Sequence, residues 1–216
     1  SKELAREESG GGFFKRLVGN YSGGIIKALT RIAGGFLSVG AAVGILKSAT
    51  KTITDFEQAN AVLASILGKS RSEIEGLTSS AKQLGATTEY TASQVTELQT
   101  VLAKLGFNEQ QIRAMQASVL QFATAVRANL ADAASLAGAT LRAFNLDASE
   151  TERVGSVMAV GANKSALSFE YLNNSMSTIA PVANSFGFSI EDTVALLGYL
   201  SNAGFDASTA ATSTRN

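Results

Sequence analysis

Apolar side chains recur along the chain at the three- and four-residue spacing of an α-helix. This spacing holds from residue 74 to residue 126 and returns between residues 169 and 197. No stretch alternates between apolar and polar residues for long enough to predict a strand. The sequence therefore predicts an all-α protein with helices of ~12–20 residues, which depend on packing because helices so short are marginal alone. The clearest stripe consists of Ile112, Met115, Val119, Phe122 and Val126.

Short turn signals separate these helical stretches. In the best example, Gly106 can take the left-handed conformation that ends a helix, and Asn108 can cap the next helix. Gln111 can return the hydrogen bond to the cap, and Phe107 can pack on both helices. The signal predicts short capped helices in antiparallel hairpins. It recurs at three further places, whose candidate cap and turn residues are Asn145, Asp147, Gly187, Ser189 and Gly204.

The turn signals also bear on repeats and on helix ends. They are separated by 39, 42 and 17 residues, intervals that indicate no fixed solenoid period. Looser capping signals pair Ser70 with Glu73 and Thr91 with Gln94. Pro181 should kink or end its helix, because a proline ring clashes with the carbonyl one turn earlier.

The chain before residue 52 has a different apolar pattern. Its apolar residues alternate at spacings of four and three, which is a heptad seam over three repeats. Gly40 and Gly44 form a pair of small residues that permits close helix approach. We expect this seam to contact other copies of the chain or a membrane. With the two glycines, it consists of Ile25, Leu29, Ile32, Phe36, Val39, Val43 and Leu46.

Three interpretations of this apolar helix remain open. Its uncharged part, residues 32–46, lies between Arg31 and Lys47 and is shorter than the ~20 residues that cross a hydrocarbon core. The helix could pack on its own domain or on copies of itself. It could also be a membrane-active helix, held in soluble form and inserted on demand. A stable transmembrane anchor is the third interpretation.

Charge and glycine content change at the same point in the chain. Residues 9–54 hold six Lys or Arg and no Asp or Glu, whereas residues 55–216 hold ten basic and fifteen acidic residues. Half of the twenty glycines precede residue 45. The change predicts a flexible or charged lead-in over 1–19, a basic Gly/Ala-rich apolar helix over 20–51, and a compact helical domain over 52–216. We expect this domain to be truncated at its C-terminus, as a piece of a longer protein.

The residue inventory argues against catalysis. The chain has no His and no Cys, which excludes the usual zinc sites, thiol or imidazole nucleophiles and disulfides. Three carboxylate pairs fall in predicted first helical turns, where capping explains them better than acid–base chemistry. We therefore predict no catalytic, cofactor-binding or metal-binding residue, no cofactor and no enzyme. The three pairs are Glu73 with Glu75, Glu150 with Glu152, and Glu191 with Asp192.

The basic segment and the glycine run carry no recognisable binding motif. Gly10, Gly11 and Gly12 lack the Gly-Lys-Ser/Thr ending of a phosphate-binding loop. The basic residues between 15 and 51 form no known nucleic-acid reader motif with the two aromatics among them, Tyr21 and Phe36, so they predict at most non-specific contact with nucleic acid and no sequence recognition.

Several short motifs together resemble the conserved core region of phage tail tape measure proteins over residues 52–215. The motifs keep the order and spacing of that family, whereas residues 1–50 match it only in style. The ending at residues 211–215 is similar to the family's Gly-Thr-x-Leu-Arg, with Ala and Thr in place of Gly and Leu. The matching segments are residues 55–59, 87–92, 102–107, 143–146 and 179–192, followed by Ala203-Gly204.

The resemblance implies a structural protein of the virion, made in the bacterial host cytoplasm. Such proteins lie in the lumen of the tail tube, set tail length and leave ahead of the DNA at infection. The implied partners are other copies of the chain, tail tube and tail tip proteins, tail assembly chaperones and the host membrane at infection. Some members carry cell-wall hydrolase domains, but no hydrolase motif is present in this sequence.

Two other classes of function remain as alternatives. One is a membrane-permeabilising helical translocation protein that acts through residues 24–47. The other is a cytosolic α-helical adaptor. The heptad seam predicts a coiled-coil oligomer through residues 20–51 and a monomeric remainder. The turn signals predict that residues 52–212 fold back on themselves, so a ruler would lie elsewhere in the parent protein.

Overall fold

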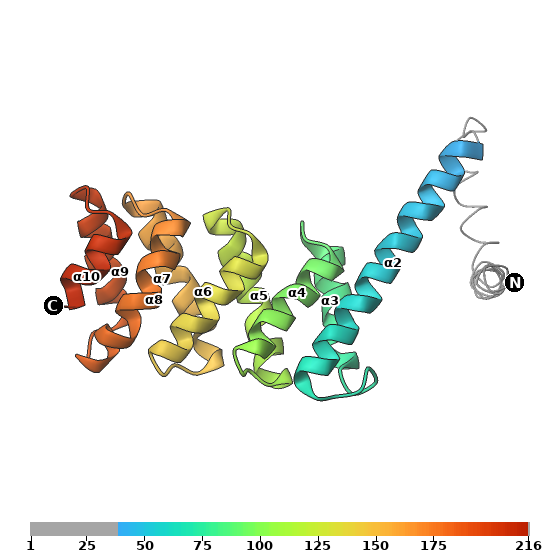
Figure 1. Ribbon diagram of the computed structural model, residues 1–216, viewed down its shortest axis with the longest axis horizontal. Helices are drawn as coiled ribbons and strands as arrows, with labels where there is room; N and C mark the ends of the chain where they lie inside the picture. Colours follow the sequence, from blue (N-terminus) through green and yellow to red (C-terminus); the bar gives the residue numbers. More distant parts are fainter. Residues whose placement is uncertain (1–38, 216) are drawn as a thin grey trace, which may run out of the picture. The chain divides into compact units, whose positions relative to one another are not determined.

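The computed structural model describes residues 39–215, with side chains for residues 51–210 and 212 (Figure 1). Residues 39–215 are helical and contain no strand, so the prediction of an all-α fold is confirmed. The chain divides into two units, Ser1–Thr52 and Ile53–Asn216. The helices are α2 (Val39–Leu67), α3 (Glu75–Thr87), α4 (Ala92–Lys104), α5 (Glu109–Val126), α6 (Leu130–Ala143), the 3-10 helix η1 (Ala148–Glu150), α7 (Thr151–Lys164), α8 (Phe169–Ser185), α9 (Ile190–Asn202) and α10 (Ala207–Arg215).

Helices of the second unit form two layers. Each helix packs on its sequence neighbours and also on the helix two places further along the chain. Helices α3, α5, α7 and α9 follow one another in what we call the odd layer, and α4, α6, α8 and α10 in the even layer. The second unit is therefore a two-layer row of antiparallel helical hairpins.

The row has a repeat period, contrary to the expectation from the intervals between turn signals. Even-layer helices α4, α6 and α8 begin after the caps Thr91, Asn129 and Ser168, at intervals of 38 and 39 residues. The turn signals 39 and 42 residues apart all end even-layer helices, whereas the 17-residue interval leads to Gly204 in the turn after α9, in the odd layer. The expectation was wrong because it compared turns from different layers.

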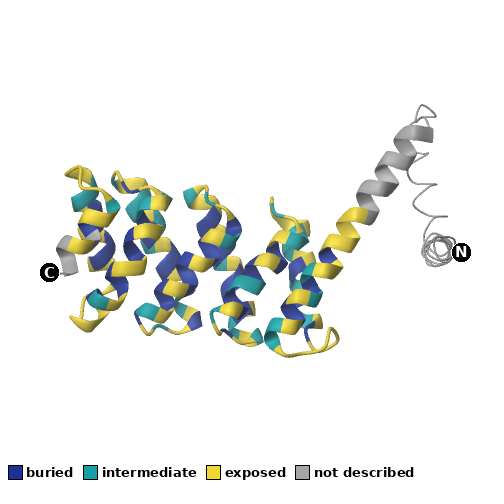
Figure 2. Ribbon diagram, in the orientation of Figure 1, coloured by how far each residue is buried: buried dark blue, intermediate teal, exposed yellow. Residues whose placement is uncertain are grey.

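A continuous apolar core runs between the two layers (Figure 2). With few aromatic residues available, small residues bring neighbouring helices into close contact. At Gly161 of α7, an added Cβ would lie only 2.4 Å from Cγ1 of Val194 of α9. At Gly138 of α6, it would lie 2.6 Å from Cδ1 of Leu105, beside α4. Close packing of this kind leaves little room for larger side chains.

A buried polar contact links both layers near the start of the row. Gln99 of α4 is fully buried, and its Nε2 donates to the carbonyl oxygen of Leu77 at 3.1 Å and to Oε1 of Gln116 at 2.8 Å. Leu77 and Gln116 belong to α3 and α5, which are neighbours in the odd layer. Because an unpaired buried amide is costly, these bonds favour one register of the three helices.

Helices α8 and α2 both continue through positions where the sequence suggested a boundary. Pro181 does not end its helix, because α8 continues to Ser185. The compositional boundary at residues 50–54 falls inside the continuous helix α2. The division into a basic helix over 20–51 and a domain over 52–216 therefore lies within one helix, and as a domain boundary it stays a prediction.

Candidate interaction surface

The predicted contact seam lies largely outside the described residues. Ile25, Leu29, Ile32 and Phe36 precede residue 39, and the seam residues from Val39 to Leu46 lie in α2 without described side chains. Their contact with other copies or with a membrane stays a prediction. Within the part of the chain that is described, no helix combines the length and apolar character needed to span a membrane.

The turn residues end and begin helices in the second unit. Gly106, Asn145, Gly187 and Gly204 all have positive φ angles, between 56° and 84°. After each of them the chain closes a six-residue helix-ending bond, as when the Phe107 amide donates to the carbonyl of Leu102 at 3.2 Å. These positions set the direction of the chain as it passes from one layer to the other.

Asn108 and Ser189 each form a reciprocal capping box. The Gln111 amide donates to Oδ1 of Asn108, the Asn108 amide donates to Oε1 of Gln111, and both distances are 3.0 Å. At the start of α9, the Asp192 amide donates to Oγ of Ser189 at 3.1 Å, and the Ser189 amide donates to Oδ2 of Asp192 at 3.2 Å. Each box gives two backbone amides at an exposed helix start a hydrogen-bond acceptor.

Asp147 caps differently from the local sequence signal. Its Oδ1 accepts from the amide of Ser149 at 2.9 Å and from the Ser149 hydroxyl at 2.8 Å, at the start of η1. These hydrogen bonds lower the pKa of the Asp147 carboxyl below its ordinary value of 3.8. Glu150, the expected return partner, bonds to Arg153 instead.

Removal of the caps should destabilise the row. Asn108→Ala is expected to lower the free energy of unfolding by ~1 kcal/mol, because the Gln111 amide loses the side-chain oxygen to which it donates. Asp147→Ala should also destabilise the protein at neutral pH, and its effect should shrink as the pH falls below 3.8 through the lowered pKa of Asp147. Urea unfolding at several pH values measures both effects, with the exposed Ser135→Ala on α6 as the control. If neither cap variant changes stability, the capping account is wrong.

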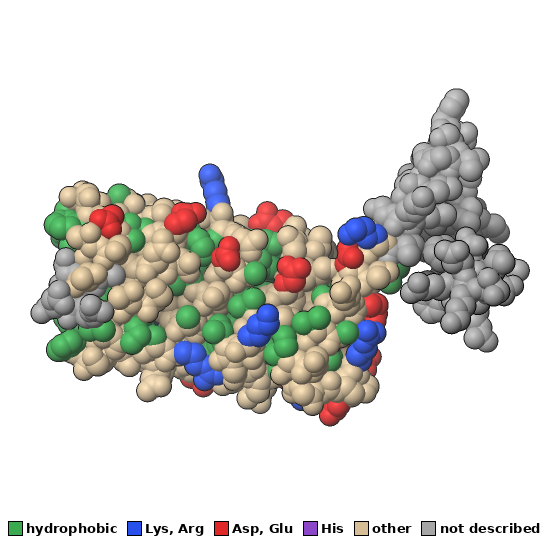
Figure 3. All heavy atoms as spheres, viewed as in Figure 1, with side chains coloured by type: hydrophobic (Ala, Val, Ile, Leu, Met, Phe, Trp, Pro, Cys, Tyr) green, Lys and Arg blue, Asp and Glu red, His purple; other side chains and the backbone are tan. Residues whose placement is uncertain are grey.

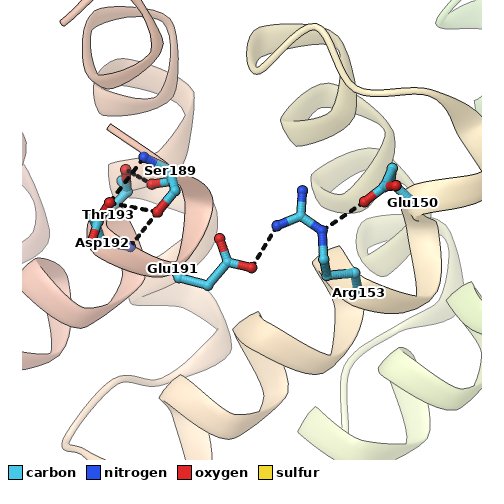
Figure 4. Close-up of polar contacts among 6 residues, drawn as sticks. All are labelled: Glu150, Arg153, Ser189, Glu191, Asp192 and Thr193. Atoms are coloured by element: carbon cyan, nitrogen blue, oxygen red, sulfur yellow. Dashed lines mark hydrogen bonds and ion pairs between the residues drawn. The ribbon is translucent and has the colours of Figure 1, made fainter. Parts of the chain in front are cut away.

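At least one member of each predicted carboxylate pair lies in a cap or an ion pair, and Figure 4 shows those around Arg153 and Ser189. Arg153 of α7 donates through Nε to Oε2 of Glu150 at 2.6 Å and through Nη1 to Oε1 of Glu191 of α9 at 2.5 Å. The hydrogen bonds to Glu150 and Glu191 raise the pKa of Arg153. Burial favours a higher pKa for Glu191, but hydrogen bonds, led by that from Arg153, lower it overall. The arrangement links neighbouring helices of the odd layer.

Glu73 and Asp192 also have lowered pKa values. Hydrogen bonds from the hydroxyl and amide of Ser70 lower the pKa of Glu73, and those from Ser189 lower the pKa of Asp192. A general acid at neutral pH would need a raised pKa instead. Among the residues with described side chains, no three acidic groups come together in a way that could hold a metal ion.

An apolar groove lies between α7 and α9, with a volume of about 520 Å³. Val157 and Val160 line it from α7, and Val194 and Tyr199 line it from α9. Val160 and Tyr199 are largely exposed. On the face drawn in Figure 3, hydrophobic side chains reach the surface along the row.

A second exposed apolar surface lies where α8 passes into α9. It consists of Phe186, Phe188 and Leu196, which we call the Phe188 surface. Residues 165–210 include no Lys or Arg, so this end of the row is apolar and acidic. This surface could not be predicted from the sequence, because Gly187-Phe188 repeats the local signal of Gly106-Phe107. The two positions differ only in how the next helix packs on them.

Comparison with known proteins finds that the chain is similar to phage tail proteins. The family model described as "Phage-related minor tail protein" matches residues 78–216. The chain is similar to the "Probable tape measure protein" of Escherichia phage P2, with 32% identity over 194 residues, 85% of this chain and 24% of the relative. It is also similar to the "Tape measure protein" of Pneumococcus phage Dp-1, with 28% identity over 173 residues, 80% of this chain and 15% of the relative. No solved structure matches the chain.

These matches cover most of this chain and little of its relatives. The chain spans about a quarter of the length of the P2 relative and less of the Dp-1 relative. The family match falls within the two-layer row, because it begins inside α3 and continues to residue 216.

Proposed function

Because the chain belongs to the family of phage-related minor tail proteins, we propose that it is the folded helical region of a tape measure protein. The observation that carries the proposal is the similarity to two tape measure proteins, from an Escherichia phage and a Pneumococcus phage, over four fifths or more of this chain. The resemblance of the ordered motifs between residues 55 and 204 supports the same assignment.

In this role the chain acts as a structural component of the tail and not as an enzyme. It is made in the bacterial host cytoplasm, occupies the lumen of the tail tube and is released at infection. Its partners are other copies of itself, tail tube and tail tip proteins and tail assembly chaperones. The lowered pKa values of Glu73, Asp147 and Asp192 support a structural use of these carboxylates.

The fold limits how residues 53–216 can contribute to a ruler. A single helix advances ~1.5 Å per residue, whereas the antiparallel helices of the row reverse direction at every turn. Each residue of the row therefore adds less length than a residue in a continuous helix. We assign the length-setting role to other parts of the longer protein, and the row to a folded region carried with it.

The test is made on the parent phage or prophage. Peptides from residues 53–216 should be found by mass spectrometry in purified tails. An in-frame deletion in a helical part of the parent outside the row should shorten the tails by ~1.5 Å per residue removed, as measured by electron microscopy. Tails that lack these peptides, or that keep their length after the deletion, contradict the proposal.

Contact with the host membrane through residues 24–47 belongs to the same proposal as a later step at infection. The apolar heptad and its flanking Arg31 and Lys47 support it, because such a helix suits an anionic lipid surface. A membrane-permeabilising protein that acts without a tail is the alternative, and the presence of the chain in tails separates the two.

A further inference from the structure

The Phe188 surface leaves two aromatic rings exposed at the end of an even-layer helix. Phe186 is 73% exposed and Phe188 is 50% exposed, although both follow directly from the end of α8. With Leu196 they line a cleft whose floor includes Ile179 and Thr193. Large aromatic side chains in this position favour a partner that removes them from water.

The first turn of the same kind shows what such a partner is. Phe107 follows Gly106 at the end of α4, and only 3% of its surface is exposed. The next even-layer helix, α6, covers it. The guanidinium of Arg142 lies 4.1 Å from the centre of the Phe107 ring, and a Cβ added to Gly138 would lie 3.3 Å from Cε2 of Phe107.

The covering residues lie in the second half of the covering helix. Gly138 and Arg142 come nine and thirteen residues after Asn129, the cap of α6. For Phe188 the next even-layer helix is α10, in which the amide of Thr209 donates to Oδ1 of Asp206 at 2.9 Å. The position equivalent to Gly138, nine residues after Asp206, is Arg215. The position equivalent to Arg142, thirteen residues after Asp206, lies beyond residue 216.

The described part of α10 is correspondingly short. It has 9 residues, whereas α6 has 14 and α8 has 17. Figure 1 shows α10 running beside α8 and stopping before the turn that joins α8 to α9. Among the described helices, α10 is the one that continues the even layer past α8. Because it stops before the turn, no described helix covers the Phe188 surface.

We propose that the polypeptide following residue 216 in the parent protein extends α10 and covers Phe186, Phe188 and Leu196. The occupant is thus the continuation of this chain, which docks as α6 docks on Phe107. The P2 relative is about four times as long as the part that this chain matches, so most of that relative lies outside the matched region. The extended α10 then connects the two-layer row to the rest of the protein, and it does so at the Phe188 surface.

Single cysteines test the proposal cleanly, because the chain has none of its own. Phe188→Cys and the control Ser135→Cys are each made in two proteins. One is the 216-residue chain, and the other is the same chain extended by the next ~20 residues of the parent sequence, which is enough for several helical turns. Maleimide should label both variants of the shorter chain at similar rates. In the extended protein Phe188→Cys should react at least about tenfold more slowly, because labelling needs an exposed thiol, whereas Ser135→Cys should be unchanged.

Three results would overturn the proposal. One is equally fast labelling of Phe188→Cys in both proteins. Another is protection of Phe188→Cys in the 216-residue chain that grows with protein concentration, since a second copy would then cover the surface. The third is a parent reading frame that stops after residue 216. If the cysteine variant misfolds, hydrogen exchange of residues 182–197 in the unsubstituted proteins gives the same answer, with slower exchange expected in the extended one.

Discussion

Replacing Phe122 with Ala is expected to lower the free energy of unfolding by about 3–5 kcal/mol. Phe122 lies in α5 and is almost completely buried. Its Cβ would be 3.2 Å from a Cβ added to Gly155 of α7, and its ring centre lies 6.4 Å from that of Phe169 of α8. Truncation therefore opens a cavity where helices of both layers meet, and backbone on the α7 side limits its collapse.

Urea unfolding followed by circular dichroism measures this loss. The matched control is Phe186→Ala, the same substitution at a largely exposed ring, which should change stability by no more than about 0.5 kcal/mol in the 216-residue chain. Because helices of the row contact only near neighbours, hydrogen exchange in the Phe122 variant should accelerate first in α5, α7 and α8. Equal effects of the two substitutions would mean that Phe122 is not at the junction of the layers.

The local structure could be predicted from the sequence because it depends on neighbouring residues. The apolar spacing placed the helices, and the Asn108 and Ser189 boxes form between a cap and its third following residue. Asp147 shows the limit of that reasoning. Its signal has the same form, but Arg153, three residues after Glu150, competes for the carboxylate that would have returned the bond.

The arrangement of the layers could not be predicted in the same way. A cap signal predicts where a helix begins but not in which layer the helix lies. The intervals between turn signals therefore mixed turns from both layers, which hid the repeat period. Phe107 and Phe188 both follow a turn glycine and precede a helix cap, yet one is buried and the other exposed. The difference depends on whether a later helix reaches that turn, which is a long-range property.

The functional assignment has two different foundations. The inventory of residues excluded chemistry that needs His or Cys, a conclusion that follows from composition alone. The positive assignment to a phage tail came from the order of short motifs, and the family match now supports it. Physical reasoning from spacing predicted a folded helical region, and only the resemblance connected that region with a tail.

The second large effect concerns a disulfide between α7 and α9. In the structure, the Cβ of Val194 lies 3.9 Å from the position of a Cβ added to Gly161, close to the ~3.8 Å average for disulfides. Gly161→Cys with Val194→Cys should therefore oxidise almost completely to an intramolecular bond. Val194→Cys also removes the methyl group that a Cβ at position 161 would otherwise meet at 2.4 Å. No native cysteine can compete.

The formation of this bond tests most directly whether residues 53–216 form a two-layer row in which alternate helices are neighbours. The control pair, Gly76→Cys with Gly198→Cys, joins α3 and α9 at opposite ends of the odd layer and should not cross-link within one chain. Thiol titration and non-reducing electrophoresis after mild oxidation give the readout. The two-layer row predicts an intramolecular disulfide for the α7–α9 pair alone. Free thiols in that pair, or equal cross-linking of the control, would contradict it.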